Sequence, residues 1–163
     1  MRRFAALSAI VLAVACSPRT GAETAPAADL APATAGTHPV SGLEVIPLAV
    51  IADGERHAFT VEVASSRQDQ ARGLMFRTEL GPNEGMLFPR TPPDVASFWM
   101  KNTPLPLDII FVGRDGRILN IAAETVPYSL DSVTAVGLTG AVLEIPGGRA
   151  AELGIEAGDK VEW

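Results

Sequence analysis

Residues 98–125, "FWMKNTPLPLDIIFVGRDGRILNIAAET", contain the pattern that decides the fold. The run from Leu107 to Val112 is almost wholly apolar, which is typical of a buried strand. "GRDG" at 113–116 is a turn sequence, and the apolar run after it completes a predicted β-hairpin. Pro104 and Pro106 exclude a helix before this strand and remove two backbone donors. That connection is therefore expected at a sheet edge or in a bent crossover, where side chains can face a cleft.

Short strands and turns continue on both sides of this hairpin. The predicted strands read "LEVIPLAVIA", "HAFTVEVA", "GMLF", "SFWM", "AVLEI" and "KVEW". Two short helices are expected, "RQDQARGL" after Ser65 and Ser66 and "RAAELG" ending at Gly154. Many short strands at this spacing predict an α+β fold that is mainly antiparallel β, a small barrel or sandwich with two short helices.

The first fifteen residues have the layout of an export signal. Arg2 and Arg3 precede an apolar stretch of roughly a dozen residues, shorter than the about 20 that a membrane-spanning helix needs. Small residues precede Cys16, the only cysteine of the chain. We therefore expect residues 1–15 to be removed as a signal peptide.

Cys16 forms no intramolecular disulfide because it has no partner, and its place at the cleavage site resembles a bacterial lipoprotein signal. We expect Cys16 to be lipidated and to hold the protein on the periplasmic side of a membrane, the outer membrane being favoured by Ser17. Secretion with a free thiol is the alternative. Residues 16–42 are rich in Ala, Pro, Thr and Gly, which predicts a flexible tether between Cys16 and a globular domain at 43–163.

The charge balance bears on the partners. The 163-residue chain has a net charge of −6. Without residues 1–15, 11 basic residues (13 minus Arg2 and Arg3) face 19 acidic ones, a net charge near −8. Nucleic acids are bound by neutralising phosphates with Lys and Arg, so we expect no nucleic-acid partner.

Several segments in the same order resemble one known family. These are "ARGLMFR" (71–77), "EGMLF" (84–88), "FWMKNTPLPLDIIF" (98–111), "DGRI" (115–118) and "VLEIPGGRAAELGIEAGDKV" (142–161). Together they are similar to the DUF192 family, also called UPF0127, over roughly residues 45–163. The resemblance implies a compact, mainly β domain that is often exported. It implies no mechanism, since the family is uncharacterised.

The polar cluster in the opening stretch is the first candidate site. A small polar ligand would find four kinds of group here. These are the aromatic ring of Trp99, the ammonium of Lys101, the amide of Asn102 and the carboxylate of Asp108. In the structural alternative, Trp99 packs in the core, Lys101 pairs with Asp108, and Asn102 caps a turn.

Two arginines extend this candidate site. Arg72 and Arg77 flank "GLMF", and with Lys101 they would bind a phosphate or carboxylate. Surface salt bridges are the equally simple alternative.

Metal binding has weaker signals. Met75, Met86 and Met100 are the methionines beyond Met1, and thioethers suit copper(I), although Met more commonly fills a core. His38 and His57 are isolated and have no zinc-type spacing. We expect no metal and no cofactor.

Catalysis is the alternative to binding. Asp108 and Glu144 are the candidate carboxylates for a hydrolase or lyase acting on an envelope saccharide. Because no nucleophile, base and orienting group appear together, we favour an exported domain that binds a small polar or anionic ligand or an envelope protein.

Overall fold

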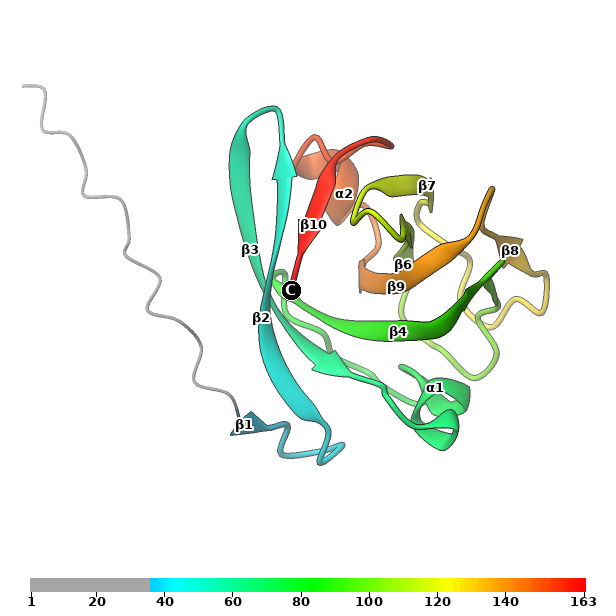
Figure 1. Cartoon of the computed structure of the whole chain (residues 1–163). Helices are drawn as coiled ribbons and strands as arrows, with labels where there is room; N and C mark the ends of the chain where they lie inside the picture. Colours follow the sequence, from blue (N-terminus) through cyan, green and yellow to red (C-terminus); the bar gives the residue numbers. More distant parts are fainter. Residues whose placement is uncertain (1–35) are drawn as a thin grey trace, which may run out of the picture. The chain divides into compact units, whose positions relative to one another are not determined.

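The computed structural model describes residues 36–163, so the predicted signal peptide and Cys16 lie outside the described residues. The strands are β1 (Gly36–Thr37), β2 (Glu44–Ala52), β3 (Glu55–Val63), β4 (Glu84–Asp94), β5 (Ser97–Phe98), β6 (Leu107–Gly113), β7 (Ile118–Ala122), β8 (Val133–Thr134), β9 (Thr139–Pro146) and β10 (Lys160–Glu162). The helices are α1 (Arg67–Arg72) and α2 (Arg149–Glu152). Figure 1 shows the two helices at opposite ends of the sheet.

One large sheet runs in the order β1-β2-β3-β4-β9-β6-β7, with β10 paired to β2, and β5 and β8 form a separate two-stranded sheet. Every strand pair is antiparallel except the parallel pair of β3 and β4. This confirms an α+β fold that is mainly antiparallel with two short helices. The strands do not close into a barrel, and the arrangement is sandwich-like. The predicted hairpin around residues 113–116 is β6–β7.

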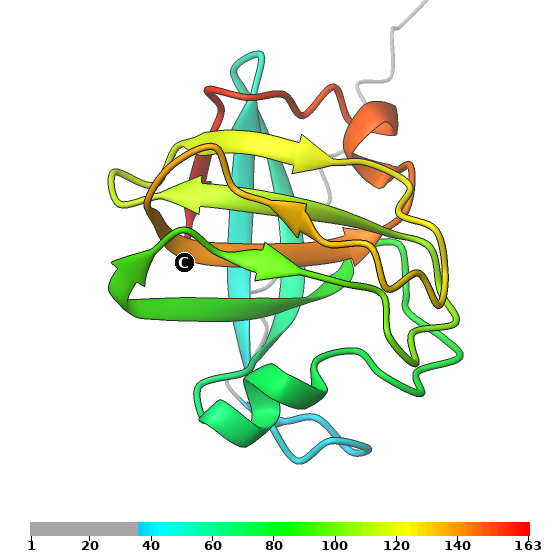
Figure 2. The ribbon, with the colours of Figure 1, turned by 90° about the vertical axis from the view of Figure 1, so that its right-hand side faces the viewer.

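The sheet folds over itself into two layers. Figure 2 shows the β2–β3 hairpin running across the strands β4, β9, β6 and β7 of the other layer. The first core lies between the layers and includes Val50, Val61, Ile110 and Leu143, which are fully buried. Strand alternation directs these side chains to one face and their neighbours to the other.

A second core covers the opposite face of β4, β9 and β6. Its buried members include Phe88, Ile109, Phe111 and Val142 from these strands. Leu74, Ala96, Met100 and Ala135 come from connecting segments that pack over this face. Both faces of β6 are therefore buried, which explains why its sequence is almost continuously apolar.

The helices are short and lie on the surface. Ser66 caps α1 through its hydroxyl oxygen, which accepts a hydrogen bond from the backbone N–H of Asp69 at 3.0 Å, and Gly73 ends the helix with a φ of 49°. Within residues 36–163, no helix has the length and apolar character needed to cross a membrane.

Two residues that precede the predicted boundary at residue 43 pair with the large sheet. Gly36 and Thr37 form β1, which pairs with Val45 and Glu44 of β2. The last residues of the predicted tether thus lie against the sheet.

Candidate ligand-binding pocket

Glu144 is a charged residue type in the middle of the central strand β9. Its neighbours Leu143 and Ile145 face the first core, so alternation directs Glu144 to the second face. There the cross-strand partners of Glu144 are Met86 of β4 and Ile109 of β6. The carboxyl group is thus placed among apolar side chains, and the residue is only 5% exposed.

Burial changes the acidity of this group. No described residue donates a hydrogen bond to the Glu144 carboxyl group or pairs with it. Because no fully buried side-chain oxygen of the described residues lacks a partner, the Glu144 carboxyl oxygens reach the cavity described below. Removal from water disfavours the charged form and raises the pKa of Glu144 from 4.5 to about 8. Glu144 is therefore mostly protonated at neutral pH.

A cavity of about 220 Å³ lies over Glu144. Its lining consists of Gln70, Ala71, Leu74, Met75, Phe88, Arg90, Ser97, Phe98, Trp99, Thr103 and Glu144. The buried members of this lining, Leu74, Phe88, Thr103 and Glu144, form the floor, and the exposed Ala71, Ser97 and Trp99 stand at the mouth. We call this cavity the Glu144 pocket.

Residues 97–103 form one wall of the pocket and are held by backbone hydrogen bonds. The carbonyl of Asn102 accepts from Phe76 N–H at 2.8 Å, and that of Thr103 accepts from Tyr128 N–H at 3.1 Å. Phe76, Asn102 and Tyr128 have φ values of 65°, 56° and 62°. Positive φ is uncommon for bulky side chains, and such conformations gather at functional sites.

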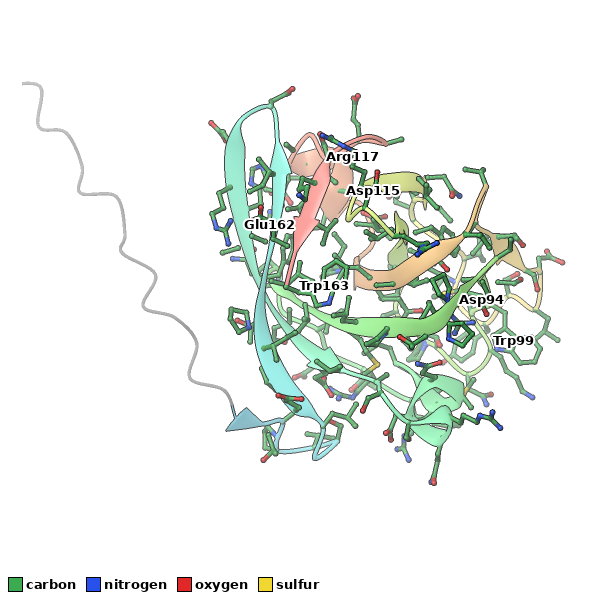
Figure 3. The ribbon with its side chains drawn as sticks, in the orientation of Figure 1. Asp94, Trp99, Asp115, Arg117, Glu162 and Trp163 are labelled. Atoms are coloured by element: carbon green, nitrogen blue, oxygen red, sulfur yellow. The ribbon has the colours of Figure 1, made fainter. Side chains whose placement is uncertain are left out.

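Trp99 and Lys101 lie together at the mouth. Trp99 is 47% exposed, so it does not pack in the core. The Lys101 ammonium lies 5.1 Å from the centroid of the Trp99 ring, a cation–π distance. Asn102 contacts Met75, another lining residue, with 3.9 Å between Nδ2 and Sδ. Figure 3 shows Trp99 at the end of the domain that carries β8, and Trp163 beside β10.

The structure does not bring Asp108 to this pocket. Asp108 is fully buried on the opposite face of the sheet, opposite Ile145 of β9. Its Oδ1 accepts hydrogen bonds from the backbone N–H groups of Glu124 at 2.7 Å and Gly148 at 2.9 Å, and its Oδ2 accepts from Ala150 at 2.8 Å. Asp108 thus caps the start of α2 and is not paired with Lys101.

Arg72 and Arg77 line a different cavity, of about 240 Å³, together with Met86. Arg77 forms an ion pair with Glu62. Its Nη2 donates hydrogen bonds to Oε1 at 2.7 Å and to Oε2 at 2.6 Å. Glu62 also accepts a hydrogen bond from the Ser41 hydroxyl group. The two arginines and Lys101 therefore do not line one common cavity.

The methionines are spread over separate surroundings. Met86 and Met100 are buried in the second core, and the Thr125 hydroxyl contacts Met100 Sδ at 3.1 Å. Met75 lines the Glu144 pocket. In the described part of the chain, no three His, Cys, Asp or Glu side chains gather as metal ligands would.

Arg90 and Gln70 are pocket residues that sequence reasoning missed. The sequence makes Glu144 a candidate only as the catalytic partner of Asp108. The signal available for it was a carboxylate inside the apolar run "AVLEI", because a charged group in a central strand is rarely buried without a purpose.

The fold and the pocket define a class: a mainly antiparallel β domain with a cavity over a buried carboxyl group. The chain belongs to the DUF192 family, described as "Uncharacterized ACR", whose model matches residues 48–163. No protein with a curated description matches the chain.

Two crystal structures are similar to this chain. One is a protein of unknown function from Novosphingobium aromaticivorans DSM 12444, with 59% identity and a TM-score of 0.79, covering 80% of this chain and 94% of that one. The other, from Sinorhizobium meliloti 1021, is described as a putative transcription regulator, with 36% identity and a TM-score of 0.70, covering 71% of this chain and 91% of that one.

Proposed function

We propose that this domain binds a small ligand in the Glu144 pocket. A polar group of the ligand meets the Glu144 carboxyl, and its carbon part packs against Phe98 and Trp99. One observation carries the proposal: Glu144 is 5% exposed, has no hydrogen-bond partner among the described residues, and lines a cavity. Lys101 and Asn102, which we predicted as ligand residues, support Trp99 and Met75 at the mouth.

The comparison with Asp108 explains why Glu144 points to binding. A buried carboxylate kept for structure is expected to have its oxygens hydrogen-bonded, as Asp108 has, because an unpaired buried charge is costly. Glu144 instead avoids the free-energy cost of a buried charge by remaining protonated. A cavity over such a carboxyl group lets a ligand reach it and form a hydrogen bond. Carboxyl groups with a shifted pKa in clefts are often part of functional sites.

Fluorescence of Trp99 tests this proposal. The variant Trp163→Phe leaves Trp99 as the only tryptophan, and Trp163 is distant from the pocket mouth (Figure 3). We expect saturable changes in Trp99 emission when aromatic fragments bearing amide, alcohol, amine or carboxylate groups are added. Adding Glu144→Leu should weaken the response at least tenfold, because the polar partner is lost.

Glu55→Gln is the matched control for the removal of a carboxylate. Glu55 is exposed at the start of β3 and forms none of the recorded side-chain contacts, so this variant should bind like its parent. A panel that leaves Trp99 emission unchanged at millimolar fragment concentrations would contradict the proposal. It would leave an envelope protein as the partner to pursue.

The catalytic alternative lacks its second carboxylate in the pocket. Asp108 and Glu144 lie on neighbouring strands but on opposite faces of the sheet, and Asp108 is occupied by three backbone N–H groups. A glycosidase needs both carboxyl groups at the same bond of the sugar. We therefore favour binding over hydrolysis or lyase chemistry.

We also propose that the protein is exported and anchored in the cell envelope through Cys16. The support is the sequence of residues 1–16, with its basic start, apolar middle and single cysteine. Cys16→Ser should move the protein from the membrane fraction to the soluble periplasm. Retention of this variant in the membrane fraction would refute the anchor.

The description of the Sinorhizobium meliloti protein as a putative transcription regulator suggests nucleic acid as a partner. We propose no such partner for this chain, because its net charge of −6 opposes binding to phosphates.

A further inference from the structure

The charges around the Glu144 pocket limit what it can hold. The lining contains two ionisable side chains, Glu144 from β9 and Arg90 from β4. The lining residues from α1, from the segment after it and from residues 97–103 are neutral. Two further charged residues contact the lining: Asp94 pairs with Arg90, and Lys101 lies over the Trp99 ring.

Arg90 uses three of its five N–H donors in hydrogen bonds to Asp94 and Gln70, and its charge is paired with Asp94. Its Nε donates to Asp94 Oδ1 at 2.9 Å, and its Nη2 donates to Asp94 Oδ2 at 2.5 Å. Its Nη1 donates to Gln70 Oε1 at 3.1 Å. The hydrogen bonds from Arg90 lower the pKa of Asp94, as expected for an ionised pair. The positive charge of Arg90 is thus balanced by Asp94, and within residues 36–163 Glu144 is the ionisable lining group without a partner.

Aromatic rings complete an environment suited to a cation. The Phe98 ring lies edge to face with Phe88, with 5.0 Å between centroids, and both rings line the pocket. The ring of Trp99 already has an ammonium group within cation–π distance, that of Lys101. Aromatic faces attract cations, and the attraction increases when the cation is desolvated.

We propose that the Glu144 pocket takes a small primary ammonium ligand, whose ammonium group pairs with the Glu144 carboxylate while its carbon part packs against Phe98 and Trp99. This inference rests on the proposed function. It replaces the anionic ligand expected from the sequence, since the arginines expected to bind an anion are paired or lie elsewhere. A primary ammonium has three N–H donors for the unpartnered carboxylate, and a quaternary one has none.

The cavity also limits the size of the ligand. Its volume of about 220 Å³ is below the roughly 300–1,000 Å³ of cavities that bury drug-sized molecules. A ligand with one ammonium group and one ring or short chain is of suitable size.

Binding is coupled to a proton. The pKa of free Glu144 is raised to about 8, so below that pH the carboxyl group is mostly protonated. When the ammonium ligand enters, Glu144 releases this proton to solvent and the carboxylate pairs with the ligand, which keeps its own charge. The apparent Kd should therefore fall roughly tenfold between pH 6 and pH 7, as the deprotonated fraction rises.

Three probes that share one ring but differ in charge test the inference: benzylammonium, benzyl alcohol and benzoate. They are titrated against the Trp163→Phe protein, with Trp99 emission as the signal and calorimetry in two buffers as the measure of released protons. We expect benzylammonium to bind at least tenfold more tightly than the other two at pH 7 and to release close to one proton.

Glu144→Gln keeps the size of the side chain and removes its charge. In this variant, benzylammonium should lose its advantage and its dependence on pH, while benzyl alcohol binds as before. Equal binding of benzylammonium to the parent protein and to the Glu144→Gln variant would mean that the acidic surface attracts it without Glu144. That result would overturn the inference. Binding of benzyl alcohol or benzoate without benzylammonium would overturn it while the proposed function stands. Failure of all three probes would overturn the inference, and the proposed function would fall with it only if the amide fragments of the panel also left Trp99 emission unchanged.

Discussion

At the scale of single residues, two carboxyl groups one register position apart have opposite roles. Asp108 of β6 faces the first core and accepts three backbone hydrogen bonds, whereas Glu144 of β9 pairs with Ile109 and faces the second core and the pocket. Because alternation reverses the face at each residue, adjacent positions on neighbouring strands lie on opposite sides of the sheet. The sequence shows two carboxylates in apolar strands, but only the register separates their roles.

Asp108→Asn should destabilise the fold without changing the pocket. In this variant an NH2 group would replace one of the two accepting oxygens. It would face a backbone N–H group, so two donors would meet and that buried N–H would have no acceptor. We expect a loss of about 3 kcal/mol in the free energy of unfolding, measured with urea. Asp115→Asn is the control, since Asp115 lies in an exposed turn and should cost less than about 1 kcal/mol. Equal losses in the two variants would remove Asp108 from its capping role.

Glu144→Gln should change how stability depends on pH. Between the unfolded pKa of 4.5 and the folded pKa of about 8, folded Glu144 retains a proton that the unfolded chain releases. Wild-type stability therefore falls as pH rises through this window, by about 1.4 kcal/mol per unit, and this contribution is absent in Glu144→Gln. The difference between the two unfolding free energies, followed from pH 5 to 8, measures it. A constant difference would mean that Glu144 is ordinarily solvated.

At the scale of elements, the segment at residues 97–103 positions the pocket mouth. Two prolines follow it, so the sequence predicted a bent connection whose side chains face a cleft, and Trp99 and Thr103 do line a cavity. The pocket itself also needs α1, β4 and β9, which are distant in sequence. Nothing local in "FWMKNT" indicates Arg90 or Glu144 as neighbours, because tertiary pairing brings them together.

Asn102 tests the importance of this segment's backbone. Its φ of 56° is accessible to Gly and strained for a β-branched residue. Asn102→Val should cost about 1–2 kcal/mol and shift Trp99 emission, whereas Asn102→Gly should remain within about 0.5 kcal/mol of the wild type. Urea unfolding and fluorescence of both variants in the Trp163→Phe background check this. Equal unfolding free energies and equal Trp99 emission for the Val and Gly variants would show that the fold does not require a positive φ at residue 102.

At the scale of the whole molecule, buried pairing fixes the N-terminal segment to the domain. The sequence predicted most of the strands, the two short helices and the α+β class, since these follow from local periodicity and turn residues. It did not indicate β1, β8 or the parallel pairing of β3 with β4. It also did not show that Arg77 would be paired with Glu62 instead of a ligand, because long-range packing decides such partners.

Arg77→Ala should destabilise the domain and release residues 36–43. Glu62 is 4% exposed, and without Arg77 its charge would be buried beside Ser41 and His38 alone. We expect a loss of about 3–5 kcal/mol and faster hydrogen exchange in β1. Arg56→Ala, which breaks the exposed pair with Glu162, should cost less than about 1 kcal/mol. Similar costs in the two variants would contradict the structural role of Arg77.

The most direct measurement of the central claim is a carbon-13 NMR titration of the Glu144 carboxyl group, with and without benzylammonium. The account predicts a midpoint near the pKa of about 8 in the free protein, because the group is buried. It predicts a midpoint lower by about three units at saturating benzylammonium, because the ligand stabilises the carboxylate and release of close to one proton at pH 7 needs a shift of that size. A midpoint near 4.5 in the free protein would contradict the buried, unpartnered carboxyl group on which the pocket depends.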